Sequence, residues 1–215
     1  MFHWYIISDN YDLLILGLLI TLKYTLITSF LGITIGLAVA ILQLRSLRAF
    51  QMAGYLFVEF FRNIPLLVWL LWSYYALPIF LGINISREMA GIIALSLYGA
   101  SYYAEILRAG IQSLDSGQTD AAKALGMSTA TAMRRIILPQ AFRRMIPPLA
   151  GQTIIVMKNT TLLSIITIPD LLYQASYVAS FTYRPMEIYT AIGIIFLIIL
   201  IPSNYVARRL EIQNN

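Results

Sequence analysis

The sequence predicts an all-α polytopic membrane protein with about five transmembrane helices. The 215 residues are 59% hydrophobic and only 12% charged, and the mean hydropathy of +0.75 is too high for a water-soluble domain of this size. Long apolar runs recur along the chain, and one polar stretch, 117–139, stands out among them. No internal repeat, low-complexity segment or soluble domain is visible, so we expect a single transmembrane domain over 1–215.

The first span is expected at 13–44, after a short lead with Trp4 that suits the membrane interface. It is longer than the ~20 residues needed to cross a bilayer, so we expect it to tilt or protrude. It is too long, and lacks the small-residue site, for a cleavable signal peptide. Lys23 lies within it and is expected to snorkel or to face the protein interior. Gly32 and Gly36 form a small-xxx-small pair, which predicts close approach of another helix.

The next two spans are expected at 65–81 and 89–107. Oppositely charged residues three positions apart share a helix face, which favours a local ion pair. Such pairs are predicted before the second span and at the end of the third: Glu59 with Arg62, and Glu105 with Arg108.

The fourth span, 149–168, carries polar residues near its middle, namely Lys158, Asn159, Thr160 and Thr161. A charge at that depth costs at least ~2.5 kcal/mol on insertion scales. Either these side chains bond to neighbouring helices while Lys158 snorkels, or they line a water-filled path where Lys158 meets a substrate carboxylate. The lysine lies about ten residues, roughly 15 Å, from either end of the span, and this depth favours the path.

The fifth span is expected at 187–206, and 169–186 is expected to be an outer loop with some helix. If 117–139 is inside, eleven of the fifteen Lys and Arg residues fall in inner segments, and only Arg87 and Arg184 fall outside. The positive-inside rule then predicts an outside N-terminus and a cytoplasmic C-terminus. Orientation explains the basic excess, so no nucleic-acid partner is expected.

The polar stretch 117–139 predicts two short helices around a corner. Thr119 can cap the first helix, and Gly126 can end it because glycine adopts the left-handed conformation without a Cβ penalty. Ser128 can cap the second helix, and Pro139 is expected to break it.

The same stretch contains Asp-Ala-Ala at 120–122, then three residues, Gly126, nine residues, and Ile136-x-Leu138-Pro139. This resembles the cytoplasmic coupling motif of ABC importer permeases, which has Glu in place of Asp120. The strings EFFRNIPLL, SYYAEILRAGIQS and KNTTLLSII are similar to the polar amino-acid uptake branch of these permeases, the histidine, glutamine and glutamate type. The resemblance covers roughly 54–168.

The resemblance implies a multi-pass permease subunit of an ATP-driven importer in the bacterial inner membrane. It implies a second permease subunit, either an identical copy or a similar chain, and an extracytoplasmic solute-binding protein that delivers a polar amino acid. ABC ATPase subunits would dock from inside and carry ATP and Mg, so no cofactor is expected in this chain. The residues expected to couple to the ATPase are Asp120, Ala121, Ala122, Leu125 and Gly126.

Two other classes remain open at this point. A membrane-embedded enzyme would need clustered catalytic groups, but the chain has one histidine, no cysteine and scattered carboxylates. It also lacks the GxxxxGK[ST] loop that cradles nucleotide phosphates. A structural or channel-type helical membrane protein would explain five spans but not the coupling stretch.

Overall fold

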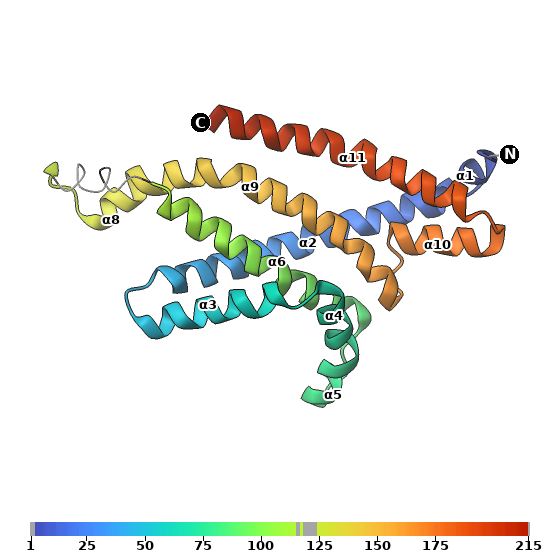
Figure 1. Cartoon of the computed structure of the whole chain (residues 1–215), viewed down its shortest axis with the longest axis horizontal. Helices are drawn as coiled ribbons and strands as arrows, with labels where there is room; N and C mark the ends of the chain where they lie inside the picture. The colour runs from blue at the N-terminus through green and yellow to red at the C-terminus, as the bar shows by residue number, and fades with distance from the viewer. Residues whose placement is uncertain (1–2, 115–116, 118–123, 215) are drawn as a thin grey trace.

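A computed structural model describes residues 3–114, 117 and 124–214, and the secondary structure of this part consists of helices. Among the described residues, four helices are long and apolar enough to cross a membrane, and the pair Arg48–Asn63 and Leu66–Leu81, bent by 100°, makes a fifth only if it is counted as one span. The long helices run along one axis of the molecule (Figure 1). The α-helices are α1 Tyr5–Asp9, α2 Tyr11–Leu44, α3 Arg48–Asn63, α4 Leu66–Leu71, α5 Leu77–Leu81, α6 Arg87–Gln112, α8 Thr129–Ala132, α9 Leu138–Asn159, α10 Leu171–Thr182 and α11 Pro185–Asn214.

Helices α2 and α6 form the centre of the bundle, and they meet at the two glycines that the sequence singled out. A Cβ on Gly36 would lie 2.9 Å from both the Ala100 carbonyl oxygen and the Ala104 amide nitrogen, and a Cβ on Gly32 would lie 3.1 Å from the Tyr103 ring. The missing side chains therefore let the two backbones touch. Tyr103 is fully buried beside them, and the predicted close approach is confirmed.

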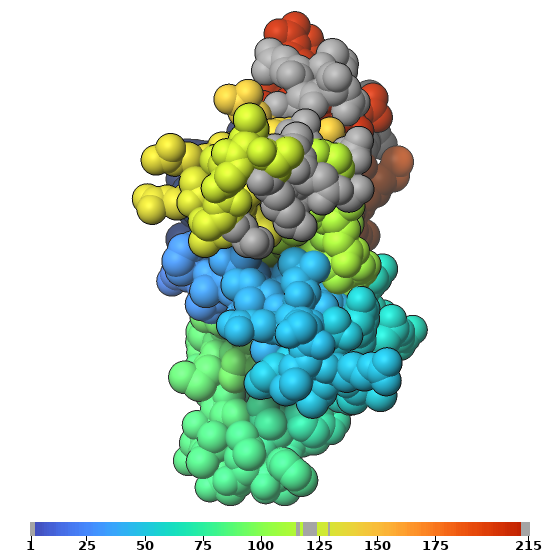
Figure 2. All heavy atoms as spheres, turned by 90° about the vertical axis from the view of Figure 1, so that its left-hand side faces the viewer, coloured from blue at the N-terminus to red at the C-terminus, as the bar shows by residue number. Residues whose placement is uncertain are grey.

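The second span begins earlier than the sequence suggested and is sharply bent. Helix α3 lies along α2 and α6, and the chain then turns by 100° into the segment Leu66–Leu81. That segment extends below the other helices in two perpendicular views (Figure 1, Figure 2). Pro65 lacks an amide hydrogen and holds Ile64 in an extended conformation, which ends α3. The expected span 65–81 is thus only the second arm of a bent pair.

The fourth span is also longer than expected, because Pro139 does not break the helix. Helical structure continues from Ala130 to Ile166, so it starts well before the predicted residue 149. A π-helical turn at Met133–Ile137 directly precedes α9, and Pro139 occupies the first turn of α9. The wider π turn changes which backbone groups pair, so the proline does not face a regular α-helical turn. The predicted helix end at Pro139 is wrong.

The segment 169–186 is built around helix α10. Asp170 caps this helix by accepting a hydrogen bond from the Tyr173 amide at 2.8 Å. Leu171 and Val178 are fully buried against Leu14 of α2 and Ile188 of α11. The outer segment is therefore packed into the bundle, and its helix joins the first span to the last.

Candidate functional site

The described residues 124–139 of the polar stretch lie at the end of the bundle where α8 projects beyond the other helices (Figure 1). Gly126 adopts a left-handed conformation with φ of +75°, so the predicted corner is confirmed at this residue. Ser128 Oγ accepts a hydrogen bond from the Thr131 amide at 3.3 Å, which confirms the second predicted cap. Leu125 is 80% exposed beside the corner. Asp120, Ala121 and Ala122 lie outside the described residues, as does the predicted cap Thr119.

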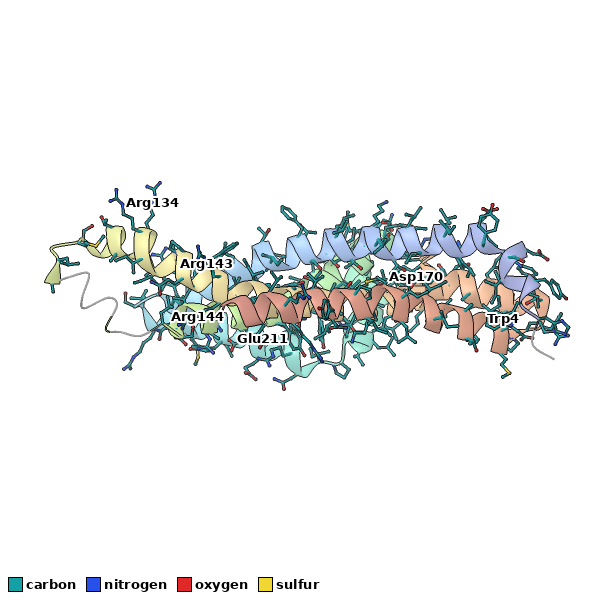
Figure 3. The ribbon with its side chains drawn as sticks, turned by 90° about the horizontal axis from the view of Figure 1, so that it is seen from above. Trp4, Arg134, Arg143, Arg144, Asp170 and Glu211 are labelled. Atoms are coloured by element: carbon teal, nitrogen blue, oxygen red, sulfur yellow. The ribbon has the colours of Figure 1, made fainter. Side chains whose placement is uncertain are left out.

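Basic side chains gather at this end of the molecule. Arg134 and Arg135 are exposed on the π-helical turn, and Arg143 and Arg144 follow on α9 (Figure 3). Trp4 lies at the opposite end. The end that carries α8 thus presents cations and an exposed apolar side chain, a combination that suits docking of a protein partner.

A second polar region lies along the part of α6 that faces α3. The Cζ of Arg62 lies 5.0 Å from the centroid of the Tyr102 ring. The hydroxyls of Tyr98 and Tyr102 are hydrogen-bonded to each other at 3.1 Å. Among the described residues no carboxylate forms an ion pair with Arg62, because Glu59 accepts instead from the Asn63 side chain at 2.8 Å. The predicted Glu59–Arg62 pair is therefore wrong.

The same face continues toward the basic end with Glu105. Its carboxylate accepts two hydrogen bonds from Arg108, at 2.7 and 3.1 Å, so this predicted pair is confirmed. Gln43 of α2 donates a third at 3.2 Å. The Arg108 guanidinium also lies 5.9 Å from the Tyr55 ring of α3. Glu105 is consequently paired within the bundle with Arg108, whereas Arg62 is exposed, has an aromatic face as its neighbour and lies close enough to Glu105 for an electrostatic attraction without an ion pair.

The four residues predicted for the substrate path do not share one surface. Lys158 is exposed and Asn159 is half-buried at the end of α9, while Thr160 is fully buried. Thr160 donates to the Met157 carbonyl at 2.7 Å, and Thr161 donates to the Lys158 carbonyl at 2.8 Å. Both hydroxyl hydrogens are thus engaged with the local backbone, in the 3₁₀ segment Thr160–Ile166 that continues the helix.

The sequence analysis missed the pairing of Arg62 with Tyr102. Their positions are forty residues apart, so no local rule links them. The available signal was the Tyr98–Tyr102 spacing of four, which places two phenol groups on one face of α6. In the described part of the chain, no group of three or more His, Asp or Glu residues is placed to hold a metal ion.

Comparison with known proteins agrees with this architecture. Residues 32–212 match the family of binding-protein-dependent transport system inner membrane components. The chain is 37% identical over 210 residues to the probable glutamine ABC transporter permease protein GlnM of Bacillus subtilis (strain 168), covering 96% of this chain and 97% of the relative. It is 36% identical over 217 residues to the glutamate/aspartate import permease protein GltK of Escherichia coli O157:H7, covering 98% and 97%.

Two solved structures resemble the whole fold. A crystal structure of an amino acid ABC transporter with histidines superposes with a TM-score of 0.93 at 34% identity, covering 99% of each chain. An inward-facing MetNI methionine ABC transporter superposes with a TM-score of 0.71 at 20% identity, covering 93% of this chain and 97% of that one, and shows the shared fold alone. The family inferred from the coupling motif is confirmed: the chain belongs to the inner membrane components of binding-protein-dependent transport systems.

Proposed function

We propose that this chain is the transmembrane permease subunit of an ATP-driven importer of polar amino acids. The observation that carries the proposal is its full-length similarity to an amino acid ABC transporter, with a TM-score of 0.93 and 34% identity. Relatives whose names specify glutamine and glutamate/aspartate support a polar substrate. Such a substrate carries an α-carboxylate and an α-amine whatever its side chain. Few protein groups along the path are therefore needed to bind it.

The partners follow from the division of labour in such an importer. ATPase subunits dock on the end that carries α8 and hold ATP and Mg, and Leu125 and Gly126 belong to the docking surface together with Asp120, Ala121 and Ala122. The exposed leucine and the left-handed corner support this role. A second permease subunit completes the core, and a solute-binding protein delivers the amino acid at the far end.

The substrate path runs past the polar face of α6. An arginine without a carboxylate partner is costly within a membrane span unless water or a ligand solvates it. The guanidinium of Arg62 lies over the Tyr102 ring, is exposed and forms no ion pair with a described residue, so its N–H groups can bind a carboxylate. Lys158 is a second candidate cation, because it is exposed at the end of α9. Asn159 and Thr161 are partly buried and are further candidates for the path, whereas Thr160, which was predicted with them, is fully buried.

In the proposed orientation of the chain, the N-terminus lies outside the bacterial cell and the C-terminus lies in the cytoplasm. The gathering of Arg134, Arg135, Arg143 and Arg144 near α8 supports it through the positive-inside rule. In intact cells a membrane-impermeant thiol reagent should label Ser86→Cys and leave Ser128→Cys unlabelled. The cysteine-free sequence provides a clean background. The reverse labelling pattern would overturn the orientation.

The function is tested by reconstitution of the chain in liposomes with its cognate ATPase and solute-binding protein. Uptake of labelled glutamine and glutamate should require ATP and the binding protein together. The binding protein loaded with its amino acid should also stimulate ATP hydrolysis. Passive flux that needs neither ATP nor the binding protein would instead support the channel-type alternative.

A further inference from the structure

A cavity of about 610 Å³ opens between α9 and α11 at the basic end of the bundle. Pro147, Pro148 and Gly151 line it on α9, so that the helix presents only small or short side chains to the cavity beyond Arg144. No atom lies within 4 Å of the position that a Cβ on Gly151 would occupy. The two helices therefore leave a space that their own side chains do not fill.

Two guanidinium groups from different helices border this cavity. Arg144 of α9 donates to the Ser113 carbonyl at 2.8 Å, which ties it to the end of α6 and leaves its other N–H groups available. Arg208 faces it from α11 and has no hydrogen bond or ion pair with any described residue. The next residue, Arg209, is engaged elsewhere, since it donates to the Tyr205 hydroxyl at 2.8 Å.

The remaining polar groups leave the cavity with a positive balance. Glu211 lines it one turn after Arg208 (Figure 3) and forms no ion pair within the described residues. Asn204 also lines it, but its amide nitrogen donates to the Leu200 carbonyl at 2.8 Å. Two cations stand against one carboxylate, which suits a ligand with a single negative charge such as a phosphodiester.

Beyond the lining of the cavity, α9 and α11 carry exposed apolar side chains on the faces that border it. On α11, Leu197 and Ile201 lie seven residues before Asn204 and Arg208, so they share the face that borders the cavity. They are 57% and 62% exposed. On α9, Ile155 lies four residues after Gly151 and is also largely exposed. An acyl chain could therefore lie along these apolar side chains while the two arginines bind the headgroup of the same lipid in the cavity.

We infer that this cavity binds the headgroup of an anionic phospholipid, with the phosphate between Arg144 and Arg208 and an acyl chain against Leu197 and Ile201. Basic pockets between transmembrane helices on the cytoplasmic side are suited to such headgroups. Free phosphate shares the headgroup chemistry, but it would leave these apolar side chains uncovered. The site is separate from the proposed path and does not depend on which solute is carried.

The test is a titration of the purified full-length chain with phosphatidylglycerol, followed by native mass spectrometry. Phosphatidylcholine with the same acyl chains is titrated in parallel. The double substitution Arg144→Gln with Arg208→Gln should weaken phosphatidylglycerol binding at least about tenfold, since each arginine contributes charge-assisted hydrogen bonds. The matched control removes two arginines from the same end but outside the cavity, through Arg134→Gln with Arg135→Gln, and should leave binding nearly unchanged.

A second variant separates shape from charge. Gly151→Leu places a side chain in the cavity at a position where a Cβ meets no atom within 4 Å, and it should weaken preferential phosphatidylglycerol binding with every arginine in place. The site would be overturned if both double arginine substitutions weakened phosphatidylglycerol binding equally, or if Gly151→Leu bound phosphatidylglycerol as the wild type does. Equal binding of phosphatidylglycerol and phosphatidylcholine by the wild type would also overturn it. Displacement of the lipid by millimolar inorganic phosphate would assign the cavity to free phosphate and would also overturn it.

Discussion

The guanidinium of Arg62, at the last turn of α3, lies 5.0 Å from the ring centroid of Tyr102 on α6. Tyr102 is in turn hydrogen-bonded through its hydroxyl to Tyr98 at 3.1 Å. The pair links the two helices just before the 100° bend that follows α3. A cation this close to the face of an aromatic ring is attracted by the ring's electron density.

We expect Arg62→Gln to reduce amino-acid uptake by about tenfold or more, because a charge-assisted hydrogen bond to a carboxylate is worth ~1.5–3 kcal/mol. Basal ATP hydrolysis by the assembled complex should persist. Arg48→Gln is the matched control, since it removes an exposed arginine from the first turn of the same helix. Uptake that is equal in the two variants would remove Arg62 from the path.

The second prediction concerns Lys158, which is exposed at the end of α9. Lys158→Met keeps the side-chain length and removes the charge, so it should leave assembly and basal ATP hydrolysis intact and cut uptake sharply. Lys23→Met is a suitable comparison because Lys23 is also exposed within a span, on α2. If uptake survives in Lys158→Met, the lysine is structural.

The third prediction separates backbone strain from coupling. Gly126 and Gly82 both have positive φ, +75° and +66°, and neither has an atom within 4 Å of its Cβ position. Valine at either position should therefore introduce a similar strain of ~1 kcal/mol or more. Gly126→Val should abolish substrate-stimulated ATP hydrolysis by the complex, and Gly82→Val should retain it.

Asp120→Lys tests the proposed coupling motif through charge and should likewise abolish stimulation, because the sequence predicts a helix N-terminus at this residue, where a cation is unfavourable. Both coupling variants should still reach the membrane. Normal stimulation in Gly126→Val and Asp120→Lys would show that this stretch does not couple the chain to an ATPase.

The fourth prediction tests the α2–α6 contact. Gly36→Ala would place a Cβ 2.9 Å from backbone atoms of Ala100 and Ala104, which cannot move aside without separating the helices. We expect a loss of ~1–3 kcal/mol in the free energy of unfolding, measured by denaturation in mixed micelles. Gly193→Ala, with no atom near its Cβ position, should change little. Similar values for the two variants would contradict the tight contact.

The fifth prediction concerns the pH dependence of stability. Asp170 is fully buried, and burial raises the pKa of its carboxyl to about 7. One oxygen accepts from the Tyr173 amide, and the other has no partner among the described residues. Because the pKa is higher in the folded state, the folded chain binds the proton more tightly. The contribution of the protonated Asp170 carboxyl to the free energy of unfolding is fully present below about pH 4. It is lost as the pH rises through about 7.

Asp170→Asn separates this titration from helix capping, since asparagine also caps helices well. The wild-type melting temperature should fall between pH 5 and pH 8, and this difference should be smaller in Asp170→Asn. Parallel pH profiles for the two proteins would exclude Asp170 as the titrating group.

Local rules predicted the conformations that depend on neighbouring residues alone. Gly126 at the corner, Ser128 at the helix start and the Glu105–Arg108 pair all follow from short-range geometry, and the structure has each of them. The same kind of rule failed at Pro139, because a π-helical turn just before α9 altered the backbone pairing. Pro147 and Pro148 lie within α9 after regular helical turns, so a proline in the sequence does not by itself specify a helix end in this chain.

The sequence by itself determined the membrane class and the family, since these depend on composition, apolar runs and a motif with fixed spacing. Tertiary structure alone decided the 100° bend after α3, the stacking of Arg62 on Tyr102 and the cavity between α9 and α11. These features depend on how distant helices pack. Pro65 required α3 to end, but it did not specify the direction that the chain takes afterwards. That direction is set by contacts with α6, which lies later in the chain.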